Sequence, residues 1–224
     1  MKWILYGAHI TIERVLSQSR FIPHVTTLSA TASIMFGILS MLGFGIADAI
    51  AKTILSSRNV IRIAVVSQAI GTSLFLIVAL GLDPFLPGFA IIFLTLMSGA
   101  LSAVVLGSYY LALGLGKASI VSPIASCMTV VAVALSFWVL GESLTWSQLA
   151  LISLVFVGII LVASDSSVPK ESGRKLSVIL ALLAAIIGGA NIIIQKWIAA
   201  SNHYLMAFFL SRVFMIGFMS PVSP

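Results

Sequence analysis

The chain has 224 residues, of which 60% are hydrophobic and only 8% are charged. So little charge cannot cover the surface of a water-soluble domain, and this composition therefore excludes an ordinary soluble protein and indicates a membrane protein. The net charge of +6 does not indicate binding to nucleic acid, because the basic residues fall between apolar runs and form no single patch. We interpret them as groups that anchor loops at anionic headgroups of the membrane lipids.

Residues 1–29 form an N-terminal leader that contains no spanning segment. His9, Glu13 and Arg14 interrupt the apolar stretch that a signal peptide would need. Two interpretations remain open. The leader is either an interfacial amphipathic helix, anchored by aromatic residues such as Trp3, or a disordered extension.

Seven apolar stretches follow the leader, each long enough or nearly long enough to cross a bilayer, which takes about 20 residues of helix. None alternates polar and apolar residues as the strands of a membrane barrel do. The sequence thus predicts an all-α membrane protein with about seven transmembrane helices, multi-pass in the cell membrane. The stretches are Ala30–Lys52, Arg62–Leu82, Gly88–Leu115, Ala118–Leu140, Ser147–Ala163, Leu176–Lys196 and Tyr204–Ser220.

One connection differs from the short loops between the other stretches. Residues 164–175 combine serine, proline, glycine and mixed charge, which is typical of a boundary between two halves. We place a first half at 30–163, with five spans, and a partial second half at 176–224, with two.

The start of the second half aligns with the first span without gaps at an offset of 144 residues. An odd number of spans in each half gives the two copies opposite orientations, as in the inverted repeats of secondary transporters. The sequence therefore predicts one complete five-helix repeat and two helices of an inverted second repeat. The aligned pairs are Ser33 with Ser177, Gly45 with Gly189, Lys52 with Lys196, Ile54 with Ile198, and Ser67-Gln68 with Ser211-Arg212.

Three motifs, in this order and spacing, carry a family resemblance. They are YLALGLGKASIVSPI from Tyr110, VLGESLTWSQL from Val139 and GIILV from Gly158. Together they resemble the EamA-type repeat of the drug/metabolite transporter superfamily, whose members usually have ten spans in two inverted halves. The resemblance implies a permease or exporter that moves a small polar metabolite, amino-acid-like or drug-like, by alternating access.

The second copy lacks three spans relative to that pattern. The resemblance implies that C-terminal helices are missing, or that a homo-oligomer completes the fold. One alternative function is a truncated, non-transporting remnant of such a transporter. A seven-helix receptor is a further alternative, which the five-plus-two repeat disfavours.

Polar residues inside the spans are the candidate substrate-binding residues, because an ionisable group in a span faces the bundle or water. Asp48 and Lys52 lie four residues apart on one helical face, where they either bind a solute or a coupling proton or neutralise each other. Arg212 lies within the last apolar run and needs a polar partner. Gln68 and Asn191 are expected to point inward.

Two further candidate residues, Tyr110 and Pro123, each have two possible roles. Tyr110 lies near the end of the third span, as a cavity wall or as part of the interfacial aromatic belt. Pro123 either kinks the fourth span beside a pathway or fixes the start of that helix.

The sequence does not predict an enzyme. His9 and His24 precede the first span and His203 lies in a loop, so the spans contain no set of side chains suited to a metal ion or to nucleophilic catalysis. We expect no cofactor and no metal.

Overall fold

The computed structural model describes residues 35, 37–43, 45–46, 60–141, 145–163 and 174–222. These residues form helices joined by short turns and no strand, which confirms the predicted all-α fold. The chain divides into two compact units, residues 1–51 and 52–224. In the first unit the described residues between Met35 and Ile46 are helical and exposed.

The second unit contains the other described helices, and their positions agree with the predicted spans. Four helical stretches, 61–82, 89–115, 118–139 and 175–199, are long and apolar enough to cross a membrane, while 204–219 is a shorter apolar helix. The helices are α3 (Val60–Leu82), α4 (Phe89–Leu115), α5 (Ala118–Ser126), α6 (Met128–Leu140), α7 (Trp146–Ala163), α8 (Arg174–Ala199) and α9 (Tyr204–Met219), followed by a 3-10 turn at Ser220–Val222.

Glycines mark the ends of two of these helices. Gly116 ends α4, and its N–H still donates to the carbonyl of Ala112. Gly141 ends α6 in the left-handed conformation, with a φ of 64°. A residue with a Cβ adopts that conformation only at a cost, so the glycine of the LGE motif provides the helix stop.

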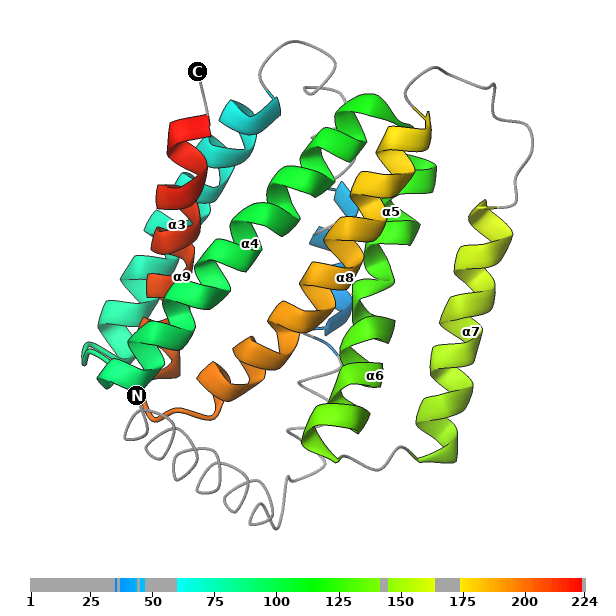
Figure 1. Ribbon diagram of the computed structural model, residues 1–224. Coiled ribbons are helices and arrows are strands. Elements are labelled where there is room, and N and C mark those ends of the chain that lie inside the picture. Colours follow the sequence, from blue (N-terminus) through cyan, green and yellow to red (C-terminus); the bar gives the residue numbers. More distant parts are fainter. Residues whose placement is uncertain are drawn as a thin grey trace, which may run out of the picture. The chain divides into compact units, whose positions relative to one another are not determined.

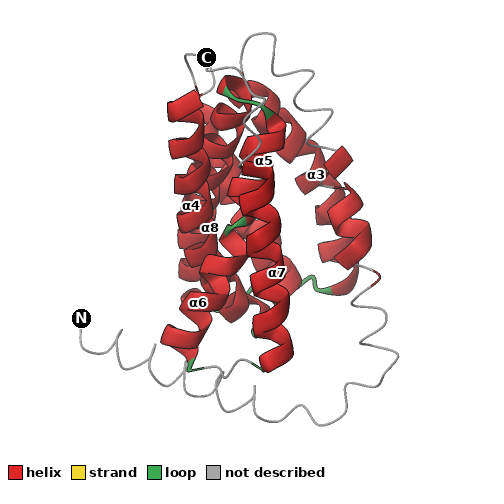
Figure 2. Cartoon of the chain, turned by 90° about the vertical axis from the view of Figure 1, so that its right-hand side faces the viewer, coloured by secondary structure: helices red, strands yellow, loops and turns green. Residues whose placement is uncertain are grey.

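The two helices of the predicted second half pack between helices of the first. Helix α8 contacts α4, α5 and α6, while α9 contacts α3 and α4. Figure 1 shows α3 and α9 as neighbours that run in opposite directions. The connections between helices that the structure describes are short loops, drawn green in Figure 2. Helix α4 is therefore the element on which both α8 and α9 assemble.

The second unit has small residues inside and large apolar residues outside, the reverse of a soluble protein. Its buried side chains are mostly alanine, serine and threonine, including Ala112, Ala181 and Ala207. Large side chains such as Phe89 and Trp138 are more than four-fifths exposed. Small residues let the backbones of membrane helices approach closely, and the large ones outside face hydrocarbon.

The fourth predicted span is interrupted, and the interruption lies at Cys127. The Cys127 N–H donates to the carbonyl of Ile124, three residues back, so the carbonyl of Pro123 lacks its usual i+4 partner. The thiol of Cys127 lies 3.8 Å from that carbonyl. The sequence pointed to Pro123 itself, whereas the structure places the turn four residues later, between α5 and α6.

Candidate functional site

Arg212 and Gln68 form a polar pair between α9 and α3. The Arg212 Nη1 donates to Gln68 Oε1 at 2.9 Å. The two residues are 144 positions apart, which is the offset of the predicted repeat. Gln68 is half-buried and Arg212 is exposed, so the guanidinium lies at the edge of the α3–α9 contact and keeps donors available.

Thr72 lies one turn beyond Gln68 on the same face of α3. Its side chain is 5% exposed, and its Oγ1 has no hydrogen-bond partner among the described residues. Ser73, by contrast, donates to the carbonyl of Ala69, which is the usual way for a helical hydroxyl to satisfy itself. A buried hydroxyl without a partner is costly, so Thr72 is a candidate contact for a bound group.

Polar side chains of α8 and α9 form hydrogen bonds with hydroxyl and carbonyl groups of α4. Ser211 Oγ of α9 donates to Ser98 Oγ at 3.1 Å. One turn along, Asn191 Nδ2 of α8 donates to Ser102 Oγ at 2.9 Å. At the far end, Ser177 Oγ of α8 donates to the carbonyl of Ala112 at 3.1 Å. These contacts join the predicted halves through α4.

Asn191 therefore contributes to the contact between α8 and α4. Its side chain is 5% exposed, and its Oδ1 is buried without a partner among the described residues. The sequence predicted an inward-pointing substrate ligand at this position. The structure places the side chain within the α4–α8 contact, where it joins two helices.

Close backbone approaches accompany the polar contacts. A Cβ added at Gly99 of α4 would lie 2.6 Å from Phe214 Cβ and 2.8 Å from the carbonyl oxygen of Ser211. A Cβ at Gly189 of α8 would lie 2.5 Å from Val131 Cγ1. Only glycine fits at such separations, so these two glycines set the distances from α4 to α9 and from α8 to α6.

Tyr110 lies beside the apolar contact between α3 and α9. It packs against the buried cluster of Ala64, Met215 and Met219, and its ring meets that of Tyr109 edge-on at a centroid distance of 5.9 Å. Tyr109 in turn shares a 3.0 Å hydrogen bond with Ser122 of α5. The two tyrosines of α4 thus contact three other helices, α3, α5 and α9.

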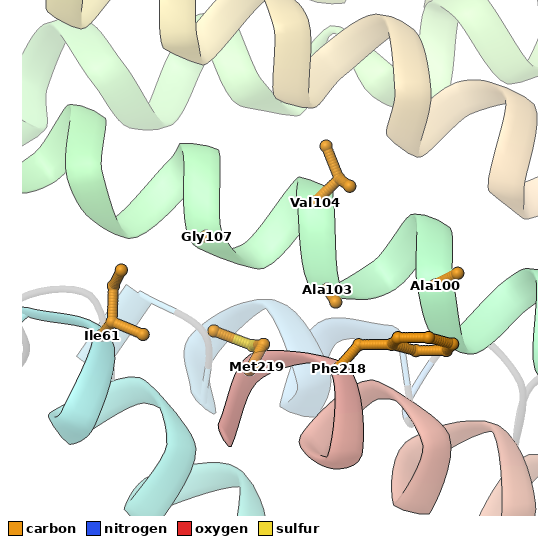
Figure 3. Close-up of a pocket in the computed structure, with 7 residues that line it drawn as sticks. All are labelled: Ile61, Ala100, Ala103, Val104, Gly107, Phe218 and Met219. Atoms are coloured by element: carbon orange, nitrogen blue, oxygen red, sulfur yellow. The ribbon is translucent and has the colours of Figure 1, made fainter. Parts of the chain in front are cut away.

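An apolar pocket of about 310 Å³ opens between α3, α4 and α9. Figure 3 shows Phe218 and Met219 of α9 facing Ala103 of α4, with Ile61 of α3 at one end. Gly107 lines the same pocket, and a Cβ there would meet nothing within 4 Å. The described residues that line the pocket include no polar side chain, so they suit a hydrocarbon group and not a polar solute.

The structure also joins two loops that the sequence did not connect. Asp83 follows α3, His203 precedes α9, and their Oδ1 and Nδ1 atoms lie 2.7 Å apart. The ring of Phe85 packs on the imidazole at a centroid distance of 5.7 Å. Asp83 follows the second predicted span and His203 follows the sixth. Because an even number of spans separates these two loops, both lie on the same side of the membrane, and the sequence could therefore have suggested that the two residues meet.

Other predicted residues fall outside the described part of the chain. These are Asp48 and Lys52, so the structure does not address their pairing. Among the described residues, no three His, Cys, Asp or Glu side chains form a group that could hold a metal ion.

Comparison with known proteins gives one match. The model of a family described as the EamA-like transporter family matches residues 31–164, more than half of the chain. No curated protein and no solved structure matches the chain.

Proposed function

The chain belongs to the EamA-like transporter family, and from this premise we propose that it is a multi-pass permease of the cell membrane that moves a small polar metabolite. Members of this family are transporters and not enzymes. The proposed mechanism is alternating access, in which two inverted halves rock around a site near the membrane midplane.

The bounds of the helices support the inverted repeat. Helices α3 and α9 begin at Val60 and Tyr204, so their starts are 204 − 60 = 144 residues apart, the predicted offset. Helix α8, Arg174–Ala199, corresponds at this offset to residues 30–55, which contain the first predicted span. The opposite directions of α3 and α9 (Figure 1) are those that an inverted copy requires.

The observation that carries the proposal is the contact between Gln68 and Arg212. When two copies of an element are related by a two-fold axis, a residue beside the axis contacts its own counterpart in the other copy. Gln68 and Arg212 are such counterparts, because they occupy equivalent positions in the 144-residue register and bond directly. The cluster of Ala64, Met215 and Met219 then lies to one side of this pair. A polar pair on the axis of two inverted halves is where transporters of this plan place their solute.

Asp48 is the proposed coupling group. It is the acidic residue of the first span, and a carboxyl group in a span can carry a proton across. An Asp48→Asn exchange should therefore flatten the dependence of transport on pH. Normal transport by this variant across the pH range would remove Asp48 from the mechanism.

A transport assay on the full chain tests the function. Cells that express the chain, and a matched strain that expresses Arg212→Gln, are loaded with labelled amino acids, organic acids and small drugs, and efflux is followed over time. We expect faster efflux of at least one polar solute from the first strain only. Equal efflux of every solute from expressing and empty cells would favour the non-transporting remnant.

A further inference from the structure

We propose that the apolar pocket between α3, α4 and α9 binds one acyl chain of an anionic phospholipid, whose phosphate group is held at the membrane surface by Arg62. This inference goes beyond the proposed transport function and does not depend on it. Three features support it: the lining of the pocket, its position along the helices and the charge at its outer end.

The lining of the pocket suits a hydrocarbon chain. Its described lining residues are apolar, and its volume is about 310 Å³. Water molecules inside it would find no hydrogen-bond partner on these side chains. Val104 and Phe218, which line the pocket, are 46% and 47% exposed, so the pocket is open to the surroundings of the bundle. Within a span these surroundings are lipid, and an acyl chain can therefore enter from the side.

The pocket lies at the depth of one lipid leaflet. Ile61 is the second residue of α3 and Met219 is the last residue of α9, so the outer end of the pocket lies where these helices reach the membrane surface. From there the pocket follows α4 from Gly107 to Ala100 (Figure 3). These seven residues rise by about 10 Å, whereas half of the hydrocarbon core is about 15 Å thick. The pocket thus extends inward over the range that acyl chains occupy.

Arg62 supplies a cation at the outer end of the pocket. It directly follows Ile61, its side chain is exposed, and it forms no hydrogen bond or ion pair with another described residue. A long basic side chain near a helix end extends to the level of the headgroups. There its guanidinium can donate two parallel hydrogen bonds to a phosphate group. Arg62 does not line the pocket, as expected, because the phosphate of a phospholipid lies outside the hydrocarbon layer.

The charge of the same membrane face favours an anionic lipid over a neutral one. Lys117 and Lys175 are exposed as well. Lys117 follows the third predicted span and Lys175 precedes the sixth, which puts both on the side of Arg62 at the start of the second. Asp83, the acidic residue of the described part of the chain, follows the second span on the opposite side. A basic face of this kind attracts anionic headgroups.

The test is lipid binding to the purified full chain, which is stripped of lipid in detergent and titrated in native mass spectrometry. The two probes are phosphatidylglycerol and phosphatidylcholine with identical acyl chains. We expect phosphatidylglycerol to bind more tightly. Glycerol phosphate, which carries the charge without an acyl chain, should not compete, and this arm separates a lipid from a free phosphate.

A photoreactive lipid locates the site. Phosphatidylglycerol with a diazirine in one acyl chain is bound to the chain and illuminated, and the crosslinked peptides are identified after proteolysis. We expect the crosslinks on residues that line the pocket, such as Val104 and Phe218. Leu74 and Ile77, which are exposed on α3 and do not line the pocket, are the comparison for lipid that merely surrounds the bundle.

The variants test the charge and the pocket separately. Arg62→Gln should weaken the binding of phosphatidylglycerol by about fivefold and leave that of phosphatidylcholine unchanged. Lys117→Gln removes the same charge from the same face, away from the pocket lining, and should have a smaller effect. Gly107→Leu places a side chain in the pocket and should weaken both lipids by more than about tenfold, because the acyl chain loses buried CH₂ groups. Gly71→Leu, at an exposed and open position of α3, is its matched control.

Three results would overturn the proposal. They are equal binding of the two lipids to the wild-type chain, equal lipid binding by the Gly107→Leu and Gly71→Leu chains, and crosslinks spread evenly over the bundle. A change of oligomeric state in Gly107→Leu, with lipid binding intact, would assign the pocket to a second copy of the chain. Arg62→Gln alters an exposed helix end and keeps the test decisive if Gly107→Leu does not fold. Because lipid binding is measured without flux, failure of this site leaves the proposed transport function standing, and failure of transport leaves the site standing.

Discussion

His203 Nδ1 and Asp83 Oδ1 lie 2.7 Å apart and join the loop after α3 to the loop before α9. The first loop belongs to the predicted first half and the second to the predicted second half. The Asp83 side chain is 11% exposed and that of His203 is 38% exposed, so water reaches one partner and leaves the other largely covered. This contact ties the halves together at one end of the bundle.

Breaking this pair should loosen the two loops. We expect the single variants Asp83→Asn and His203→Ala to lower thermal stability and the double variant to lower it by less than their sum. The coupling should be about 1 kcal/mol, since solvent screens the exposed imidazole. Thermal unfolding of the four proteins in one detergent measures it. Strictly additive losses would mean that the two side chains do not interact.

Gly99 should tolerate no side chain. An added Cβ would lie 2.8 Å from the backbone oxygen of Ser211 and 3.1 Å from the backbone nitrogen of Met215, and backbone atoms cannot rotate away. We expect Gly99→Ala to destabilise the chain by about 1 to 3 kcal/mol. Gly107→Ala, two turns along α4, is the matched control, because nothing lies within 4 Å of its added methyl group. Equal unfolding midpoints for the two variants would contradict the close approach of α4 and α9.

The bond between Asn191 and Ser102 should contribute modestly to stability. Hydrogen bonds between membrane helices average about 0.6 kcal/mol in double-mutant cycles. We expect a coupling of this size between Asn191→Ala and Ser102→Ala, measured from unfolding in detergent or nanodiscs. Ser73→Ala should show no coupling to Asn191→Ala, because its hydroxyl bonds the carbonyl of Ala69 in its own helix. Coupling of both pairs alike would indicate a general effect of lost hydroxyl groups.

The interruption at Cys127 should depend on Pro123. Proline in a helix interior removes one hydrogen bond and clashes with the preceding turn, at a cost of about 3 kcal/mol. Pro123→Ala should therefore raise the unfolding temperature. If the turn between α5 and α6 moves during transport, the same variant should also slow solute efflux. Unchanged stability would show that the surrounding helices, and not the proline, hold the turn.

The positions of the helices could be predicted because a bilayer imposes a minimum length of apolar residues. The second, third, sixth and seventh predicted stretches agree with α3, α4, α8 and α9 to within a few residues. The family was also predictable, from motifs that begin at Tyr110, Val139 and Gly158, and the match over residues 31–164 confirms it.

The contacts between helices were less predictable. The repeat register aligned Gln68 with Arg212, but an alignment does not state that two aligned residues touch. Asn191 was expected to face a solute because its polarity is unusual in a span, and the structure shows that its amide nitrogen donates to Ser102 on α4, while its Oδ1 has no partner among the described residues. The partner of a polar side chain depends on which helices are adjacent, and hydropathy carries no such information.

The hydroxyl groups of α4 also have a consequence for how the protein is made. Ser102 and Ser98 find their partners 89 and 113 residues later in the chain. At about 5 to 20 residues per second, a ribosome reaches those partners on the order of 5 to 20 seconds after it has synthesised α4. Until then the hydroxyl groups of α4 can bond to carbonyl groups one turn back in their own helix, as that of Ser73 does in α3. The close contacts at Gly99 form only once α9 has been synthesised.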